Sequence, residues 1–406
     1  MHVQLAWRNV WRNPRRTMII LSAVIIGAWA MILFGALSRG MMTSMLSTSL
    51  NTLTGHIQIQ KPQYREDPVV DHRISDPASL ESVLNANLPP GARWTLRIQV
   101  DGVASNARHS QGIVIVGIDP EKETAISFYG NDMWQGRLLN RNDAHGIVIG
   151  KALAEAFETK PGRKLVVMSQ GADGQTASGA LKILGIYRAE MPATEKRYVF
   201  VTLPAARTLL GIEDKAVTSA CIKLSDLDGV DRVVQTIGSK LPDNLVALSW
   251  KDLLPLLNGY LGVFDGFMLL WYLVVFVAMA FGLVNTMLMA VLERTREFGL
   301  LKALGMKPYW IVRGVLTESL MILAVGLLAG NLVGMATVQA FSGGIDLGFL
   351  SKGSEYFGMG RVIVPFLTPK DMLAVNAVIL VLGLIVCLYP AIKAGRIAPV
   401  EAMAQT

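Results

Sequence analysis

The chain has few residues that could bind a metal or form a disulfide. It contains only two cysteines and five histidines among its 406 residues. The histidines follow no helical or hairpin spacing, and no second cysteine or nearby carboxylate completes a ligand set. Cys221 lies in a polar region and Cys387 in an apolar one, so we expect the two to stay unpaired. We therefore predict no metal site and no internal disulfide.

The motifs of an enzyme are missing as well. The run that comes nearest to a phosphate-binding loop begins at Gly146 and continues to Lys151. It is one residue too short, and Ala152 follows where a hydroxyl side chain is needed. No nucleophile elbow or triad-like arrangement occurs either. We expect no catalytic residue and no cofactor in this chain.

Long apolar runs, by contrast, are abundant. Hydrophobic residues make up 52% of the chain, and the mean hydropathy is positive, which is typical of membrane proteins. Each of four runs is long enough to cross a bilayer as a helix. They are Thr17–Ser38, Phe267–Leu292, Tyr309–Phe341 and Met372–Pro390. A cleaved signal peptide is the alternative for the first run, but its apolar core is longer than such a signal needs.

The positions of the basic residues predict the orientation. The loops and termini that we place in the cytoplasm carry Arg8, Arg12, Arg15, Arg16, Arg294, Arg296, Lys302, Lys307, Lys393 and Arg396. By the positive-inside rule, both termini and the loop after the second run face the cytoplasm. We therefore expect a multi-pass membrane protein with both termini in the cytoplasm. Orientation also explains the basic character of the chain, and no nucleic-acid-binding module is visible.

The predicted fold is an α-helical membrane protein with four transmembrane helices and a large mixed α/β extracytoplasmic domain between the first and second. The expected segments are an interfacial helix (1–16), helix 1 with a stalk (17–50), the domain (51–250), a stalk with helix 2 (251–292), a cytoplasmic surface helix (293–308), helix 3 (309–341), an outer loop (342–370), helix 4 (371–390) and a cytoplasmic tail (391–406).

The domain alternates short strands and helices and is expected to form two lobes. Predicted strands are Gly112–Ile118, Ile147–Ile149, Lys164–Met168, Leu181–Tyr187, Tyr198–Thr202 and Ser219–Leu224. Predicted helices are Pro77–Asn85, Lys151–Phe157, Pro204–Leu210 and Asp228–Lys240, the last capped by Asp226 or Asp228.

Polar and small residues inside the apolar runs indicate helix packing. Gly326, Gly330 and Gly334 recur every four residues and predict a close helix–helix contact, to which we add Asn285. Glu318 and Arg313 are charges within the third run, and Glu318 is expected to tie helices together or to pair near the inner leaflet. A proton or ion pathway would need more such groups.

The segment from Glu293 to Met306 is amphipathic and lies between two apolar runs, so we predict a surface helix on which a partner docks. The residues that offer charges for pairing are Glu293, Arg294, Arg296, Glu297 and Lys302, and the apolar anchors are Phe298, Leu301 and Leu304.

The run from Asn285 to Gly305 closely resembles the signature of FtsX-like ABC permeases, which include lipoprotein-releasing and macrolide-exporter permeases. Further segments similar to that family are 5–16, 147–154, 181–186 and 389–403. Macrolide exporters usually carry an ATPase at the N-terminus of the same chain, and this chain does not. The arrangement is therefore more similar to that of the lipoprotein-releasing permeases.

The resemblance implies a protein of the bacterial inner membrane that works by a mechanotransmission mechanism. The segment 293–308 would be a coupling helix that fits a groove on a separate cytoplasmic ATPase, present in two copies that bind ATP and Mg²⁺. A second permease copy or a paralogue completes the unit, which extracts or exports lipoprotein or another hydrophobic cargo. Further partners are membrane lipid and a periplasmic adaptor or carrier. The alternative is a signalling permease that activates a periplasmic partner, such as a cell-wall hydrolase, without moving cargo.

Overall fold

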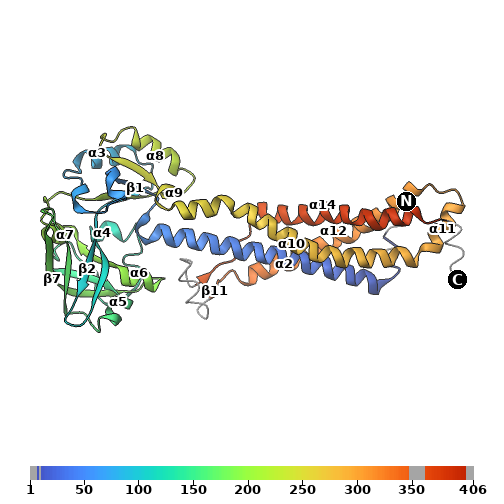
Figure 1. Ribbon diagram of the computed structural model, residues 1–406, viewed down its shortest axis with the longest axis horizontal. Coiled ribbons are helices and arrows are strands. Elements are labelled where there is room, and N and C mark those ends of the chain that lie inside the picture. Colours follow the sequence, from blue (N-terminus) through green and yellow to red (C-terminus); the bar gives the residue numbers. More distant parts are fainter. Residues whose placement is uncertain (1–6, 9–10, 347–361, 399–406) are drawn as a thin grey trace. The chain divides into compact units, whose positions relative to one another are not determined.

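The computed structural model describes residues 7–8, 11–346 and 362–398 (Figure 1). The chain divides into two compact units. The helical unit comprises residues up to 43, 261–346 and the described residues from 362 onward, and the α/β unit comprises 44–260. The boundaries between them fall within two long helices, α2 (Pro14–Ser49) and α10 (Pro255–Glu293).

The helical unit is built from α2, α10, α12 (Pro308–Ala340) and α14 (Pro369–Arg396), which are long and apolar enough to cross a membrane. The prediction of four spanning helices, with the α/β domain between the first and second, is confirmed. The helices exceed the apolar runs at several ends, because polar residues continue the same hydrogen-bonded ladder. For example, α14 passes Pro390 and ends at Arg396, within the predicted tail.

Small residues let α12 approach α2 closely. A Cβ atom added to Gly326 would lie 2.7 Å from a methyl carbon of Val24, and one added to Gly330 would lie 2.7 Å from the Cβ of Ala28. Gly334 faces Ile32 in the same way. The glycine face therefore packs against a helix of the same chain. Asn285, by contrast, is exposed on α10.

Polar contacts reinforce the bundle. Asn331 of α12 donates its amide N–H to Asn376 of α14 at 2.8 Å, and the Trp29 indole donates to Thr337 at 3.1 Å. Arg39 of α2 forms ion pairs with Asp265 of α10 at 2.9 Å and with Asp371 of α14 at 2.6 Å. Three of the four helices are thus joined by one guanidinium group, which satisfies the buried Asp371 carboxylate.

The α/β unit contains a ten-stranded sheet with the order β10-β1-β9-β2-β3-β8-β5-β7-β4, and β6 pairs with β2 and β7. The strands are β1 (Ile57–Gln60), β2 (Arg93–Ser105), β3 (Ser110–Ile118), β4 (Met133–Gly136), β5 (Gly146–Gly150), β6 (Lys164–Gln170), β7 (Thr176–Tyr187), β8 (Tyr198–Thr202), β9 (Ser219–Lys223) and β10 (Val246–Ser249). The helices are α3 (Ala78–Asn87), α4 (Pro120–Glu123), α5 (Lys151–Ala156), α6 (Pro192–Arg197), α7 (Leu203–Leu210), α8 (Val230–Gly238) and α9 (Trp250–Leu253).

The long strand β2 serves two groups of strands. Its first part, Arg93–Arg97, pairs with β9, and its second part, from Ile98 to Ser105, pairs with β3. The core beside the second group is aromatic: the rings of Tyr129 and Tyr187 pack on Phe200 with centroids 4.9 and 5.5 Å apart. All six predicted strands are present, with ends shifted by a few residues.

The predicted cap of α8 is wrong. The helix begins at Val230, and Gly229 occupies the N-cap position without a side-chain hydrogen bond. The Asp226 carboxylate instead accepts the backbone N–H of Asp228 at 3.1 Å, which closes a local turn before the helix.

Candidate coupling site at helix α11

Helix α11 (Thr295–Ala303) lies between the end of α10 and the start of α12 (Figure 1). Arg294 at its N-terminus has non-helical dihedral angles, and Leu304 ends it. Gly305 follows with φ of +94°, a conformation that glycine adopts without a steric penalty. Two breaks thus separate a short surface helix from two membrane-spanning ones.

One face of α11 is held by the rest of the helical unit. Phe298 is only 5% exposed, and the Arg294 guanidinium lies 5.1 Å from the centre of its ring. Arg294 also pairs with Glu318 of α12 at 2.9 Å and with Glu297 at 3.2 Å. The Lys302 ammonium donates to the carbonyl oxygens of Gly395 and Ile397 at the end of α14. A cation at a helix C-terminus is a favourable electrostatic contact.

Two N-terminal basic residues contact α11 and the end of α10. Arg12 pairs with Glu297 at 2.5 Å, and Arg16 pairs with Glu293 at 2.6 Å. Burial raises the pKa of the Glu297 carboxyl, but hydrogen bonds from Arg12 and Arg294 outweigh this effect and hold the pKa below its ordinary value. Glu297 is therefore charged at neutral pH and bridges two segments of the chain.

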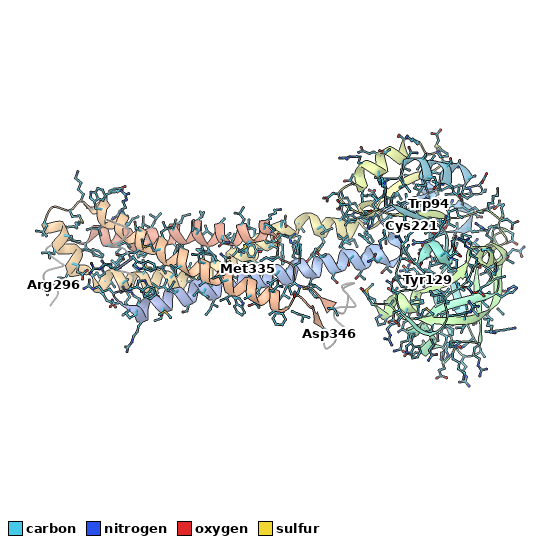
Figure 2. The ribbon with its side chains drawn as sticks, turned by 180° about the vertical axis from the view of Figure 1, so that it is seen from behind. Trp94, Tyr129, Cys221, Arg296, Met335 and Asp346 are labelled. Carbon is cyan, nitrogen blue, oxygen red and sulfur yellow. The ribbon has the colours of Figure 1, made fainter. Side chains whose placement is uncertain are left out.

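The opposite face of α11 is open. Leu300 is 56% exposed and Leu304 is 77% exposed, and Met306 beyond the helix end is also exposed. Arg296 is exposed as well and makes no ion pair with the described part of the chain, and Figure 2 shows it at the extremity of the helical unit. We call Arg296, Leu300, Leu304 and Met306 the outer face of α11. An exposed apolar patch with a cation beside it is suited to a protein partner.

The structure changes the roles of several predicted docking residues. Phe298 was predicted as an apolar anchor for the partner, but its side chain is buried within the chain. Leu301 is half-buried, and Lys302 caps α14. The charges of Glu293, Arg294 and Glu297 are paired within the chain. Of the predicted docking residues, Arg296 and Leu304 are therefore the ones that remain exposed for contact with a partner.

Sequence reasoning missed Leu300, Met306, Arg12 and Arg16 as parts of this site. The contacts of Arg12 and Arg16 could have been predicted from the sequence. Basic residues before the first span and acidic residues after the second lie on the same side of the membrane, where they can form ion pairs. Glu318 lies within the predicted third span and pairs with Arg294. Arg313 is exposed on α12, with its guanidinium 5.5 Å from the Trp310 ring centre.

Among the described residues, no group of three or more His, Cys, Asp or Glu side chains is arranged to hold a metal ion. A groove of about 480 Å³ in the α/β unit is lined by polar and apolar residues of β2, β3 and α6, including Asp101, Lys196 and Arg197. The two free cysteines are both buried.

Four helices that are long and apolar enough to cross a membrane, with an α/β domain between the first two, define a multi-pass membrane protein with a large inserted domain. The sequence matches the family described as the FtsX-like permease C-terminal over residues 269–399 and the MacB-like periplasmic core domain over residues 17–240. The chain belongs to the FtsX-like permeases that carry a MacB-like periplasmic core domain, which are permeases of ABC transporters.

Individual relatives are distant in sequence. The chain is 21% identical to the lipoprotein-releasing system transmembrane protein LolE of Haemophilus influenzae, over 98% of each chain. It is 24% identical to the pyoverdine export ATP-binding/permease protein PvdT of Pseudomonas syringae, over 99% of this chain but 59% of that protein. The extracellular domain of the transporter YknZ from Gram-positive bacteria aligns with a TM-score of 0.34 and 12% identity, covering 48% of this chain and 100% of that one.

Proposed function

We propose that this permease is driven by a separate cytoplasmic ATPase that docks on the outer face of α11. Two ATPase copies, which bind ATP and Mg²⁺, would serve two permease chains. Their closure moves α11 and the helices attached to it, and the movement reaches the α/β domain. That domain then extracts or exports a lipoprotein or another hydrophobic cargo at the outer side of the inner membrane.

The geometry of α11 is the observation that carries this proposal. Its inner face is joined by ion pairs, hydrogen bonds and the buried Phe298 to α10, α12, α14 and the N-terminal segment, whereas its outer face is open. A force applied to the outer face is therefore passed to several membrane helices rather than bending a loop. The relatives support the rest, since one is named a lipoprotein-releasing protein and another an export ATP-binding/permease protein.

The docking site is tested by reversing the exposed charge of Arg296 and by placing a charge in the apolar patch. Arg296→Glu and Leu304→Asp should each reduce the ATPase that copurifies with a tagged permease by roughly tenfold or more, the loss expected at the centre of an interface. Stimulated ATP hydrolysis should fall in parallel. Glu297→Lys is a poorer probe, because it also breaks the pairs with Arg12 and Arg294.

Lys393→Glu is the matched control, because Lys393 is exposed near the end of α14 and the substitution changes the net charge by the same amount. It should copurify the ATPase at the wild-type level. Equal ATPase recovery from Arg296→Glu, Leu304→Asp and the control would reject the docking assignment.

Cargo is tested by crosslinking the purified ATPase complex and identifying what the α/β domain holds. Acylated protein that leaves on ATP hydrolysis supports lipoprotein release. A cell-wall hydrolase that is retained and activated during hydrolysis would instead favour the signalling alternative.

A further inference from the structure

The first long helix ends in an unusual turn where it enters the α/β unit. Residues Leu50–Thr54 form a π-helical turn, and Leu53 within it has φ of +111°. A bulky side chain rarely adopts this conformation, and it persists only where neighbouring contacts over-determine it. Gly55 follows with φ of +64° and leads into β1. We call residues 50–56 the α2–β1 junction.

Two side-chain donors, one of them fully buried, converge on the carbonyl group of Leu53. The Arg97 Nη1 donates to this oxygen, and the Gln58 side-chain amide donates to it at 3.2 Å. The other Arg97 nitrogens, Nε and Nη2, donate to the Glu123 carboxylate at 3.0 and 2.6 Å. Glu123 thus orients the guanidinium group, and the guanidinium group fixes the strained main chain of the junction.

Burial makes this arrangement unusual. The Arg97 side chain is 1% exposed and that of Glu123 is 0% exposed, and Cys221 beside them is also buried. A buried ion pair adds little net stability, because the loss of hydration offsets the attraction, and apolar replacements of both partners are often tolerated. Its contribution here is geometric, since it holds one carbonyl oxygen in one place.

The junction has further attachments to the sheet. The Lys223 ammonium on β9 donates to the Asn51 side chain at 3.0 Å, and the Asn51 carbonyl accepts the backbone N–H of Phe128, also at 3.0 Å. One turn earlier, Thr48 donates to Glu190 at 2.8 Å. The end of α2 is therefore fixed to several segments of the α/β unit.

The exit from the unit is built differently, although it lies beside the junction. Strand β10 pairs with β1, with Ser249 opposite Ile57, and leads to α9. Leu254 then leaves the helical conformation with ψ of 62°, and Pro255 begins α10. Proline lacks an N–H and disfavours a helical residue before it, so the backbone ladder is broken here. Beyond the break Leu256 is 91% exposed, and a Cβ added to Gly259 would meet no atom within 4 Å.

We infer that the Arg97–Glu123 pair is a positioning device that makes the α2–β1 junction stiff, while the Leu254–Pro255 break makes the exit a hinge. A rotation of α2 is then passed to the α/β domain, and a rotation of α10 is absorbed at the hinge. The difference in stiffness between the junction and the hinge is independent of the proposed function. Its role in transmitting movement to the α/β domain rests on that function.

Spin-label distances in the full-length chain test the stiffness directly. One label pair, Ser47→Cys with Asp214→Cys, reports on the junction, and a second, Asn258→Cys with Asp214→Cys, reports on the hinge. Ser47, Asp214 and Asn258 are exposed, and Cys221 and Cys387 are buried, so only the introduced thiols react. We expect a single narrow distance peak for the first pair and a broad distribution for the second.

The decisive variant removes both charges. Arg97→Met with Glu123→Leu leaves no unpaired charge, so the domain should still fold even where Arg97→Gln alone does not. The narrow peak of the first label pair should be lost, and the second pair should be unchanged. Conversely, Pro255→Ala restores an N–H and should narrow the second distribution. Arg108→Met with Glu158→Leu, which removes an exposed ion pair, is the control and should alter neither.

A folded double variant that keeps the narrow peak would overturn the inference, as would a narrow hinge distribution in the unmodified chain. These outcomes do not depend on an ATPase. If the wild-type permease binds no ATPase but the distances behave as expected, the proposed function fails and the stiff junction stands. In the ATPase complex, the double variant should keep basal hydrolysis and lose the nucleotide-dependent shift of the first peak.

Discussion

A single buried histidine makes the α2–β1 junction sensitive to pH. The Nδ1 atom of His56 accepts the backbone N–H of Leu224 at 3.1 Å, so the ring must be neutral at that atom. Burial, with a smaller contribution from the Lys223 charge, lowers the pKa of His56 below its ordinary value of 6.5. Protonation therefore costs the folded state a hydrogen bond and buries a charge.

The sign of the pH effect follows from that lowered pKa. Well above pH 6.5 His56 is neutral in both the folded and the unfolded state, and its contribution to stability is fully present. As the pH falls below 6.5, His56 binds a proton in the unfolded chain before it does so in the folded one. The free energy of unfolding therefore decreases, by up to about 1.4 kcal/mol per pH unit, until the pH reaches the folded-state pKa. Thermal unfolding of the full chain in detergent at pH 7.5 and 5.5 measures this loss.

His56→Asn isolates the histidine, because the asparagine oxygen can accept the same N–H but does not titrate. Other groups titrate in both proteins, so the prediction concerns the difference between them. Between pH 7.5 and pH 5.5, the melting temperature of the wild type should fall by more than that of the variant. An equal loss in both would show that His56 does not sense pH.

At the scale of elements, the packing of α12 on α2 makes a prediction with a control on the same helix. Gly330→Leu would place a side chain into Ala28 and the backbone at Ile25, and overpacking of this kind costs about 1–3 kcal/mol. Gly314→Leu introduces the same residue where a Cβ meets no atom within 4 Å. Thermal unfolding in detergent should show a lower midpoint for Gly330→Leu only. Equal midpoints for both variants would contradict the close helix contact.

The elements that the sequence predicts best are those whose own residues suffice to define them. An apolar run of membrane length forms a helix whatever its neighbours are, and apolar strands such as Tyr198–Thr202 stand out in the same way. Strands β1, β2, β4 and β10 were missed. The short β1, Ile57–Gln60, carries glutamines at alternate positions, and its partners β9 and β10 lie more than a hundred residues away, so no local pattern marks it.

The coupling segment shows the same limit at its side chains. Its place in the chain was predictable from charge between two apolar runs. The sequence did not reveal which of its charged residues are already paired within the chain. Glu293 pairs with Arg16 and Glu297 with Arg12, and these arginines lie nearly three hundred residues earlier. Phe298 is buried through tertiary packing, which periodicity in a helix of nine residues does not reveal.

At the scale of the whole molecule, the proposed mechanism needs the α/β unit and α11 to lie on opposite sides of the membrane. An odd number of spans separates them, because α10 alone connects the exit from the α/β unit to α11. By the positive-inside rule, the basic residues beside α11 and near both termini predict that these regions face the cytoplasm. In the proposed mechanism, this orientation gives one chain access to an ATPase in the cytoplasm and to a cargo on the outer side of the membrane.

This orientation is tested with one introduced thiol on each side. Cys221 and Cys387 are buried, and burial raises the pKa of the Cys221 thiol, so the native cysteines should not react with a membrane-impermeant maleimide. In spheroplasts, Asp214→Cys in the α/β unit should be labelled at once, and Lys393→Cys near the end of α14 only after the membrane is opened. Inverted vesicles should give the reverse result. Labelling of Lys393→Cys in intact spheroplasts would place α11 outside and leave an ATPase no access to it.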